Sequence, residues 1–372
     1  MKILYVANRY SPLRMQDGSG TDYDLYHALL AQGGTVEVVG PFAEVCGLIE
    51  RGYRKLHRLF SKERYAKHSL AYLRASAREV ERVVEAFEPQ VIFGFFGAPF
   101  VRLRTNVPLV YMLDTTIIGQ QQQDPLFSWL EYRRMLAWER EVVRKSAHVI
   151  TCSRWSAEFL ERDYGLLAER ITVLPIPASL PAAAIPQELD FEKPQFRPLR
   201  LLLVGRMYQR KGIDIAIEVV EQLNRAGIAT ELRIVGLSGE DRPHVQFTRL
   251  YDKVQPADLA EYTGHYQWAH FLIHPARFEA AGIVASEAAA FGVPTLTNAA
   301  GGLATTVEDQ VSGIVLPRGS PAEAYVAALQ RWLDAPEDYL ELRRSTRQRF
   351  ERELNWQAAG KRLLAIIEKV VR

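Results

Sequence analysis

Hydrophobic residues along the chain alternate between short continuous runs and longer stretches with helical spacing. The short runs predict buried strands at residues 2–7, 35–39, 91–95, 109–113, 148–152, 171–174 and 199–204. The longer stretches predict helices over residues 21–32, 43–87, 126–146 and 213–223, and one that starts at residue 156. Strands that alternate with helices in this way indicate parallel sheets covered by helices, the α/β class.

A proline-rich connector divides this pattern into two halves. Six prolines lie within a short stretch: Pro175, Pro177, Pro181, Pro186, Pro194 and Pro198. Such a composition is typical of a linker, and 372 residues are more than a single hydrophobic core normally serves. We therefore expect one Rossmann-like domain over residues 1–178 and a second over residues 195–350.

A glycine loop with cations follows the first strand of the second half. Gly205 comes directly after the apolar run, Arg206 and Lys211 follow it, and a helical pattern begins after Gly212. Arginine can hold two phosphate oxygens at once, and lysine adds a point charge. The sequence LLLVGRMYQRKG thus indicates a phosphate-binding loop.

Two glutamates flank a second glycine turn further along. Glu279 and Glu287 stand on either side of Ala281 and Gly282, and residues 283–290, which begin with Ile283 and Val284, are predicted to be helical. The free N–H groups and the positive dipole end of that helix would face any ligand of Glu279. Glu287 lies among alanines inside the helix, where a carboxylate needs a partner.

The two motifs together resemble the G-R-x4-K-G and E-x7-E regions of retaining glycosyltransferase family 4, which has the GT-B fold. The strand that leads into HPARFEAAGIVASEAAAFG fits as well, and residues 350–371 resemble the final helix that returns to the first domain. This resemblance implies two Rossmann-like domains with an interdomain cleft and a crossing segment at residues 351–372. It also implies that Arg206 and Lys211 bind the diphosphate of a UDP- or GDP-sugar, Glu287 the ribose, and Glu279 with the Gly282 region the hexose.

Two features of the first half are candidates for the same site. The loop that contains Gly20 follows the first strand too late for a dinucleotide fingerprint, which argues against a dehydrogenase, and we expect it to approach the donor phosphates or the acceptor. Asp114 ends a predicted strand, so it either positions the acceptor or caps the following turn; both alternatives remain open. Asp22 and Asp24 do not face the same way on a helix, so we expect them to be solvated and no metal or other cofactor to be bound.

Composition and charge limit the classes of partner and the cellular location that we expect. Lys+Arg 46 against Asp+Glu 44 gives a net charge of +2, too balanced to indicate nucleic-acid binding. Two cysteines imply no disulfide framework, and no apolar run reaches the length of a membrane span, so we expect a cytoplasmic protein. Residues 48–70 (LIERGYRKLHRLFSKERYAKHSL) form a basic amphipathic pattern. It fits a peripheral helix on the inner face of a membrane and equally a helix packed on the sheet with a solvated basic face.

The expected function is transfer of a hexose from a nucleotide-diphosphate sugar to a hydroxyl of a glycan, a lipid-linked glycan or a small molecule, with retention. Arg206, Lys211, Glu279 and Asp114 would serve the chemistry. The alternatives are a GT-B enzyme of different chemistry, such as a nucleotide-sugar epimerase or a sugar-phosphate synthase, and a non-catalytic GT-B subunit.

Overall fold

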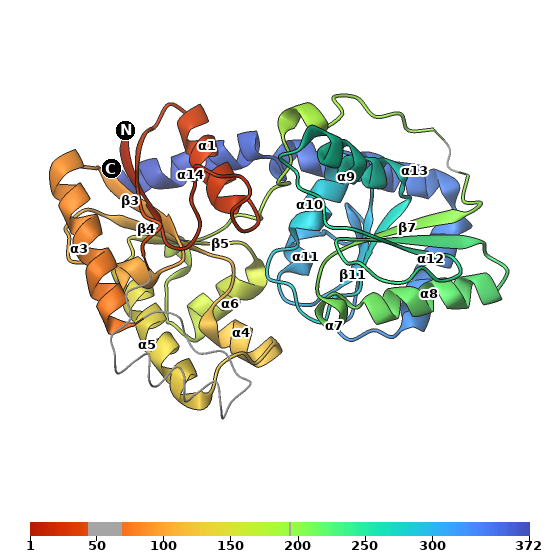
Figure 1. Ribbon diagram of the computed structural model, residues 1–372, viewed down its shortest axis with the longest axis horizontal. Helices are drawn as coiled ribbons and strands as arrows, with labels where there is room; N and C mark the ends of the chain where they lie inside the picture. The colour runs from red at the N-terminus through yellow and green to blue at the C-terminus, as the bar shows by residue number, and fades with distance from the viewer. Residues whose placement is uncertain (44–68, 193–194) are drawn as a thin grey trace. The chain divides into compact units, whose positions relative to one another are not determined.

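The protein divides into two compact units in the computed structural model, which describes residues 1–43, 69–192 and 195–372. The first unit consists of Met1–Leu174 together with Ala359–Arg372, and the second of Pro175–Ala358. Each unit has its own parallel sheet with helices on both faces (Figure 1). The pattern of residues 48–70 lies almost entirely outside the described residues.

The first unit is built on a six-stranded parallel sheet in the order β2-β1-β3-β4-β5-β6. Its strands are β1 (Lys2–Ala7), β2 (Thr35–Val39), β3 (Val91–Phe95), β4 (Leu109–Leu113), β5 (His148–Thr151) and β6 (Ile171–Val173). Every residue of β3, β4 and β5 is buried, which explains why these strands read as continuous apolar runs.

The helices of the first unit in the described ranges are α1 (Thr21–Ala31), α3 (Leu70–Phe87), α4 (Ile117–Gln123), α5 (Trp129–Lys145), α6 (Arg154–Arg162) and most of α14 (Trp356–Val371), with 3₁₀ turns at Ala98–Phe100 and Ala168–Arg170. A serine or threonine side chain caps the start of α3, α4, α5 and α6. The serine Oγ of Ser128 caps α5, and that of Ser153 caps α6. These caps explain why α5 begins three residues later, and α6 two residues earlier, than the apolar spacing predicts.

The second unit contains a six-stranded parallel sheet in the order β12-β11-β10-β7-β8-β9. Its strands are β7 (Leu199–Val204), β8 (Thr230–Val235), β9 (Val245–Thr248), β10 (Phe271–His274), β11 (Thr295–Asn298) and β12 (Gly313–Leu316). The covering helices are α7 (Tyr208–Lys211), α8 (Ile213–Arg225), α9 (Pro256–Trp268), α10 (Ile283–Ala290), α11 (Leu303–Thr306), α12 (Ala322–Leu333) and α13 (Pro336–Glu353), with a 3₁₀ turn at Ala182–Ala184.

The strand order reverses between β10 and β7 in the second unit and between β1 and β3 in the first. In open parallel sheets, ligands bind beyond the carboxyl ends of the strands at such a reversal. The Gly205 loop leaves β7 and the Glu279 loop leaves β10. The two sequence motifs therefore emerge side by side at the reversal of the second sheet.

Two details of the predicted helices are corrected by the structure. The segment expected to form one final helix contains two, because α13 ends at Glu353 and α14 begins at Trp356. Asp22 is not solvated: only 4% of its surface is exposed, and it accepts a 2.9 Å hydrogen bond from the Tyr5 hydroxyl.

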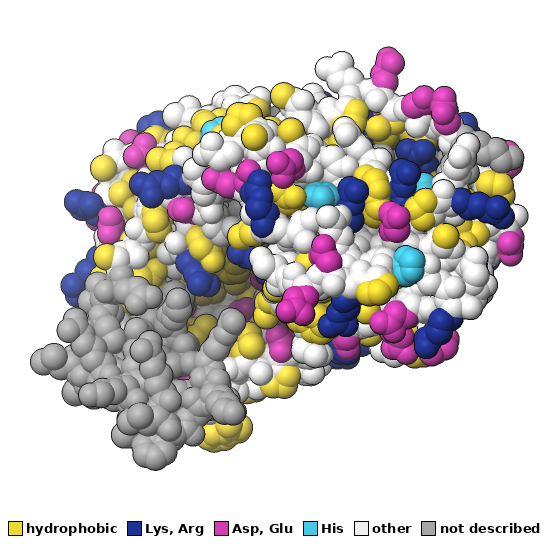
Figure 2. Space-filling view, turned by 45° about the vertical axis from the view of Figure 1, so that its right-hand side comes forward, with side chains coloured by type: hydrophobic (Ala, Val, Ile, Leu, Met, Phe, Trp, Pro, Cys, Tyr) yellow, Lys and Arg dark blue, Asp and Glu magenta, His cyan; other side chains and the backbone are white. Residues whose placement is uncertain are grey.

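Acidic and basic side chains are interspersed on the face of the molecule shown in Figure 2. Within the described ranges, the chain contains no helix that combines the length and the apolar character needed to cross a bilayer.

Candidate functional site

Lys211 and the Gly205 loop are shaped by glycines. A Cβ atom at Gly205 would lie 2.8 Å from Cγ of Lys211, so the lysine side chain passes over this glycine. Gly212 has φ +68°, and a Cβ there would lie only 1.9 Å from the carbonyl oxygen of Pro275. The close approach at Gly212 brings α7 against the loop that carries Glu279, and only glycine permits it.

Arg277 and Arg210 fasten the same two loops together. Arg277 donates to the backbone oxygen of Gln209 at 2.7 Å and pairs with both carboxylate oxygens of Asp214 at 2.8 and 2.6 Å. Arg210 donates from Nε to the carbonyl oxygen of Phe278 at 3.1 Å, and its guanidinium lies 4.9 Å from the Phe278 ring centroid. The contacts of Arg210 and Arg277 therefore hold the loop that carries Lys211 next to the loop that carries Glu279.

Glu279 is the centre of a charged cluster. Its Oε2 forms an ion pair with Nζ of Lys211 and lies 3.6 Å from Nε2 of His274, while its Oε1 lies 3.9 Å from Arg210. The Glu279 side chain is 13% exposed. Burial alone would raise the pKa of this carboxyl, but Lys211, His274 and Arg210 outweigh burial and hold its pKa well below the usual range.

Gly282 turns the chain from Glu279 into α10. It has φ +73° and precedes Ile283 and Val284, the partly buried first residues of the helix. The buried Ala281 accepts a hydrogen bond on its carbonyl oxygen from the Thr306 hydroxyl. The first turn of α10, with its free N–H groups, therefore begins four residues beyond Glu279, at Ile283.

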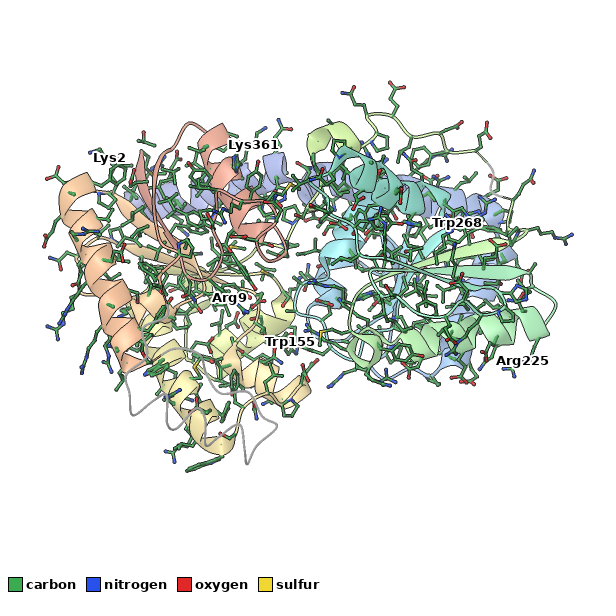
Figure 3. All side chains as sticks on the ribbon, in the orientation of Figure 1. Lys2, Arg9, Trp155, Arg225, Trp268 and Lys361 are labelled. Atoms are coloured by element: carbon green, nitrogen blue, oxygen red, sulfur yellow. The ribbon has the colours of Figure 1, made fainter. Side chains whose placement is uncertain are left out.

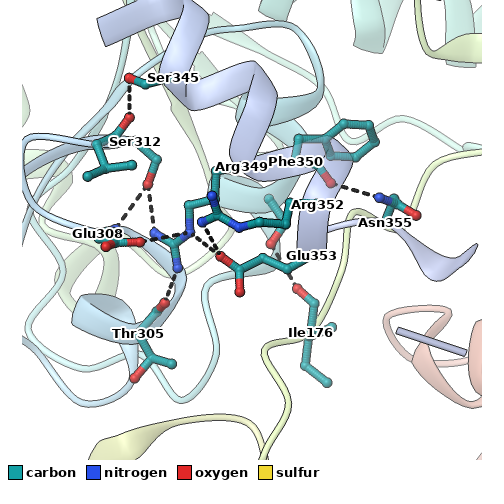
Figure 4. A network of polar contacts seen from close by, with 12 residues as sticks. Ile176, Thr305, Glu308, Ser312, Ser345, Arg349, Phe350, Arg352, Glu353 and Asn355 are labelled. Atoms are coloured by element: carbon teal, nitrogen blue, oxygen red, sulfur yellow. Dashed lines mark hydrogen bonds and ion pairs between the residues drawn. The ribbon is translucent and has the colours of Figure 1, made fainter. Parts of the chain in front are cut away.

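Arg349 supports this turn from behind. Its guanidinium is 4% exposed and donates to the Thr305 carbonyl oxygen at 2.6 Å and to Oγ of Ser312 at 2.8 Å, and it pairs with Glu353 at 3.0 Å (Figure 4). Thr305 belongs to α11, whose preceding residue Gly302 donates to the carbonyl oxygen of Glu279 at 2.8 Å. Arg349 thus fixes α11, and α11 fixes the Glu279 loop.

Glu287 lies one turn into α10 and is 1% exposed. Its Oε2 accepts from the hydroxyls of Tyr262 at 2.6 Å and Tyr266 at 2.8 Å, and its Oε1 lies 3.0 Å from Nζ of Lys253. Lys253 also donates to the carbonyl oxygen of Ser179 at 2.8 Å. This network supplies the partners that a carboxylate in an alanine-rich helix requires.

Arg206 is the remaining charged side chain that the sequence predicted for the donor site. Arg206 is exposed and has no ion pair or hydrogen bond with any described residue. It is available to an incoming anion, whereas Lys211 is already paired with Glu279.

Asp114 and Gly20 lie in the first unit. Asp114 follows β4, and its Oδ1 accepts from the backbone N–H of Thr115 at 2.7 Å, while α4 is capped by Thr116 instead. Glu139 is close enough for the charge of Asp114 to influence it; burial raises the pKa of Glu139 to about 7, against hydrogen bonds from Tyr164 and Ile117 that lower it. Gly20, with φ +82°, is the residue before α1.

The carboxyl edge of the first sheet also gathers residues that the sequence did not single out. Arg9 follows β1, Phe96 follows β3 with φ +75°, and Trp155 stands in the first turn of α6 after β5. Figure 3 labels Arg9 and Trp155 at this edge. A bulky residue with positive φ marks a backbone that its surroundings hold in an unfavourable conformation, which is frequent at ligand sites.

The structure therefore unites Lys211 and Glu279 and adds Arg210 and His274 to them. It places Glu287 in a separate network with Lys253, Tyr262 and Tyr266. Arg210 lies inside the phosphate-binding loop and His274 only five positions before Glu279, whereas Lys253, Tyr262 and Tyr266 belong to no recognisable motif. Within the described ranges, no three His, Cys, Asp or Glu side chains form a group that could hold a metal ion.

Chemically, the edge between β7 and β10 can bind a di-anion. Two cations, Lys211 and Arg210, and the start of α10 lie beside one ionised carboxylate, which can accept hydrogen bonds from hydroxyl groups, and the exposed Arg206 lies in the same loop as the two cations. This combination fits a ligand that carries both phosphates and a sugar.

Two solved structures resemble the whole chain. Sucrose-phosphate synthase from Thermosynechococcus elongatus superimposes with a TM-score of 0.69 at 19% identity and covers 99% of this chain and 98% of that one. Anabaena HepE in complex with UDP-glucose gives a TM-score of 0.62 at 16% identity and covers 99% and 100%. The chain has the GT-B fold of two units with parallel sheets.

Sequence relatives agree with this fold. A glycogen synthase of Mycobacterium tuberculosis is 30% identical over 266 residues, which are 68% of this chain and 61% of the relative's length. A D-inositol 3-phosphate glycosyltransferase of Xylanimonas cellulosilytica is 28% identical over 240 residues, or 59% of this chain and 56% of the relative. The chain thus spans roughly three-fifths of the relatives it matches.

Family models match both halves of the chain. The model for Glycosyltransferase Family 4 matches residues 23–178, and the model for Glycosyl transferases group 1 matches residues 186–349. Together they span most of the described residues, including every motif residue from Gly205 to Glu287. The chain therefore belongs to glycosyltransferase family 4.

Proposed function

We propose that this protein transfers a hexose from a nucleotide-diphosphate sugar to a hydroxyl acceptor, with retention of the anomeric configuration. The observation that carries the proposal is the Lys211–Glu279 ion pair at the strand-order reversal, with Arg210 and the start of α10 beside it. Relatives named as glycogen synthase and D-inositol 3-phosphate glycosyltransferase, and a neighbour bound to UDP-glucose, support a nucleotide-sugar donor.

The donor would be divided among groups of the second unit. Arg206 and Lys211 bind the diphosphate, and Gly205 lets that loop approach it. Glu279 and the backbone of Ala281, Gly282, Ile283 and Val284 bind the hexose. Glu287 accepts from the ribose hydroxyls through Oε1, the oxygen that Lys253 occupies in the free protein.

The chemistry follows from where charge develops. The bond between C1 of the hexose and the diphosphate oxygen breaks, the acceptor oxygen bonds to C1, and the ring passes through an oxocarbenium-like state. Negative charge that builds on the leaving diphosphate is stabilised by Lys211, Arg206 and the N-terminal dipole of α10. In the first unit, Asp114 would orient the acceptor hydroxyl or receive its proton, and the loop at Gly20 would approach the phosphates.

The acceptor is proposed to be a glycan, a lipid-linked glycan or a small molecule, and the protein to work in the cytoplasm. For a lipid-linked acceptor, residues 48–70 would supply peripheral contact with an anionic membrane. Co-sedimentation with anionic vesicles at low salt tests this contact, and its loss at high salt is expected because the attraction is electrostatic.

A donor screen tests the proposal. UDP, GDP, ADP and their sugars are added in thermal unfolding experiments, since a ligand that binds only the folded state raises the midpoint. The donor that binds is then incubated with candidate acceptors, and both nucleotide release and glycoside formation are measured. Lys211→Met should lower kcat/KM by roughly 30- to 1,000-fold, about 2–4 kcal/mol of transition-state stabilisation.

The products separate this function from its rivals. Glycoside formation is the expected result, and the configuration at C1 of the product tests retention. Interconversion of the donor sugar without an acceptor would indicate an epimerase, and a sugar-phosphate product would indicate a synthase. Binding without any turnover would indicate a non-catalytic subunit.

A further inference from the structure

Lys211 and Glu279 pose a problem for donor binding. The proposed function requires Lys211 to bind the diphosphate and Glu279 to bind the hexose, yet in the structure they are paired with each other. A diphosphate competes for the Lys211 ammonium, and a buried carboxylate that loses its cation is costly. Arg210 remains 3.9 Å from Oε1 of Glu279, but Oε2, the oxygen that Lys211 holds, then needs another partner.

His274 is placed to be that group. It is the last residue of β10, its side chain is fully buried, and neither ring nitrogen has a hydrogen-bond partner among the described residues. Nε2 lies 3.6 Å from Oε2 of Glu279, the same oxygen that Lys211 holds. That distance is several tenths of an ångström too long for a hydrogen bond, so a small movement of the carboxylate would form one.

Buried polar groups without a hydrogen-bond partner are uncommon, and each lowers the stability of the folded protein. Thr297 of the neighbouring strand β11 donates to the backbone oxygen of His274 at 2.7 Å, which fixes the strand but leaves both ring nitrogens without a hydrogen bond among the described residues. The imidazole is therefore held in position for an interaction that the free protein does not make.

Resting on the proposed function, we propose that His274 is a positioning residue for Glu279. When the diphosphate draws Lys211 away, Nε2 of His274 takes its place as the donor to Oε2 of Glu279, and the imidazole takes up a proton from solvent. The carboxylate keeps a cationic partner throughout, and donor binding is linked to proton uptake.

The charges around His274 give the sign of this linkage. Burial lowers the pKa of His274; Glu279 in the following loop raises it, and Lys211 and Arg210 of α7 lower it. A diphosphate that binds the Lys211 ammonium offsets the charge of this cation, so its lowering effect on the pKa of His274 is removed while the raising effect of Glu279 remains. The pKa of the imidazole must then rise, and at a pH between its free and bound values the site binds a proton.

Calorimetry with UDP-2-fluoro-glucose, an analogue that resists transfer, measures this proton. Titrations at pH 7 in buffers of different ionisation enthalpy should show uptake on the order of one proton per site. His274→Gln keeps an N–H near the position of Nε2 but cannot titrate, so it should bind with nearly normal affinity and no proton uptake. His274→Leu has no donor and should bind about tenfold more weakly.

His265→Gln is the matched control, because His265 is also a buried histidine of the second unit, with Nε2 at 3.0 Å from the Tyr251 hydroxyl. It should leave proton uptake unchanged. Uptake that persists in His274→Gln, or equal affinities of the Gln and Leu variants, would overturn the inference.

A second measurement needs no donor. NMR titration of the His274 ring in the free protein should show a higher pKa in Lys211→Met than in the unmodified chain, because a cation that lowers the pKa has been removed. An unchanged titration overturns the inference whatever the donor. Failure of every nucleotide sugar to bind would count against the proposed function, and the NMR result would still decide the coupling of Lys211 to His274.

Discussion

Glu279 and Glu287 are neighbouring carboxylates whose partners differ in kind. Glu279 is paired with two cations that an anionic ligand can attract, namely Lys211 and Arg210. Glu287 accepts from two buried tyrosine hydroxyls and from Lys253. The first glutamate can therefore change partners during a reaction, whereas the second is buried and ties α10 to Tyr262, Tyr266 and Lys253.

This difference predicts opposite effects of two conservative changes. Glu279→Gln should lower kcat, since hydrogen bonds to a ring that gains positive charge strengthen in the transition state. Because this change removes the charge that pairs with Lys211, binding of bare UDP should be unchanged or tighter. Glu287→Gln should weaken UDP binding and cost about 1–3 kcal/mol of stability, because an amide N–H would face Lys253. Calorimetry with UDP and steady-state kinetics measure both. If Glu279→Gln proves the poorer binder of UDP, the two roles are reversed.

Asp22 predicts a pH dependence of stability. Burial raises the pKa of Asp22 to about 6, although the Tyr5 hydroxyl lowers it. A raised carboxyl pKa stabilises the folded state below the unfolded value, near 4, and this contribution is lost as pH rises through 6. Between pH 5 and pH 8 the unmodified protein should lose about 1–2 kcal/mol relative to Asp22→Asn, at about 1.4 kcal/mol per pKa unit.

Urea unfolding at the two pH values measures this difference. Asp190→Asn in the exposed connector is the control and should show no such change. Equal pH dependence of Asp22→Asn and the unmodified protein would show that Asp22 does not titrate in this range.

At the scale of elements, α7 and the loop after β10 behave as one piece, because a glycine lets them touch. Gly212→Ala should be severely destabilising: the left-handed conformation costs about 1–2 kcal/mol for any L-residue, and the clash with Pro275 adds to it. Gly227→Ala shares the positive φ, at +82°, but has no atom within 4 Å of the added Cβ. It should cost only the conformational part.

Thermal unfolding and donor affinity of the two variants test the coupling. Gly212→Ala should lose both stability and UDP-sugar affinity, whereas Gly227→Ala should keep its affinity. Equal effects would mean that the contact between α7 and Pro275 can relax without consequence.

The strands and the motifs that follow them were the features that the sequence could predict. Buried parallel strands are continuous apolar runs, so Lys2–Ala7, Leu109–Leu113 and Leu199–Val204 were predicted to the residue. The Lys211–Glu279 pair joins two motifs that each follow a strand at the sheet reversal. Lys253 and Tyr262 reach Glu287 from separate elements, and no local spacing predicts such contacts. The burial of Asp22 could not be predicted either, because its partner Tyr5 lies on another element, β1.

At the scale of the whole molecule, the charges nearly balance, but cationic side chains are concentrated in one loop. The net charge is only +2, yet Arg206, Arg210 and Lys211 gather within one loop. Such a cluster can neutralise a diphosphate without a divalent ion, so we predict that transfer persists in excess EDTA. Complete loss of activity in EDTA, restored by Mg²⁺ or Mn²⁺, would contradict this prediction.

The first unit is discontinuous along the chain, since Ala359–Arg372 rejoins Met1–Leu174 after all of Pro175–Ala358. Gly360 of α14 packs so closely on α1 that an added Cβ would lie 3.1 Å from the Ala28 carbonyl oxygen, and Arg362 donates to the Val173 carbonyl oxygen at 3.2 Å. On the ribosome, the segment made first must therefore wait, with the face of α1 uncovered, until the second unit has been synthesised. The second unit is one continuous segment, so no residue synthesised after Ala358 is needed to complete it.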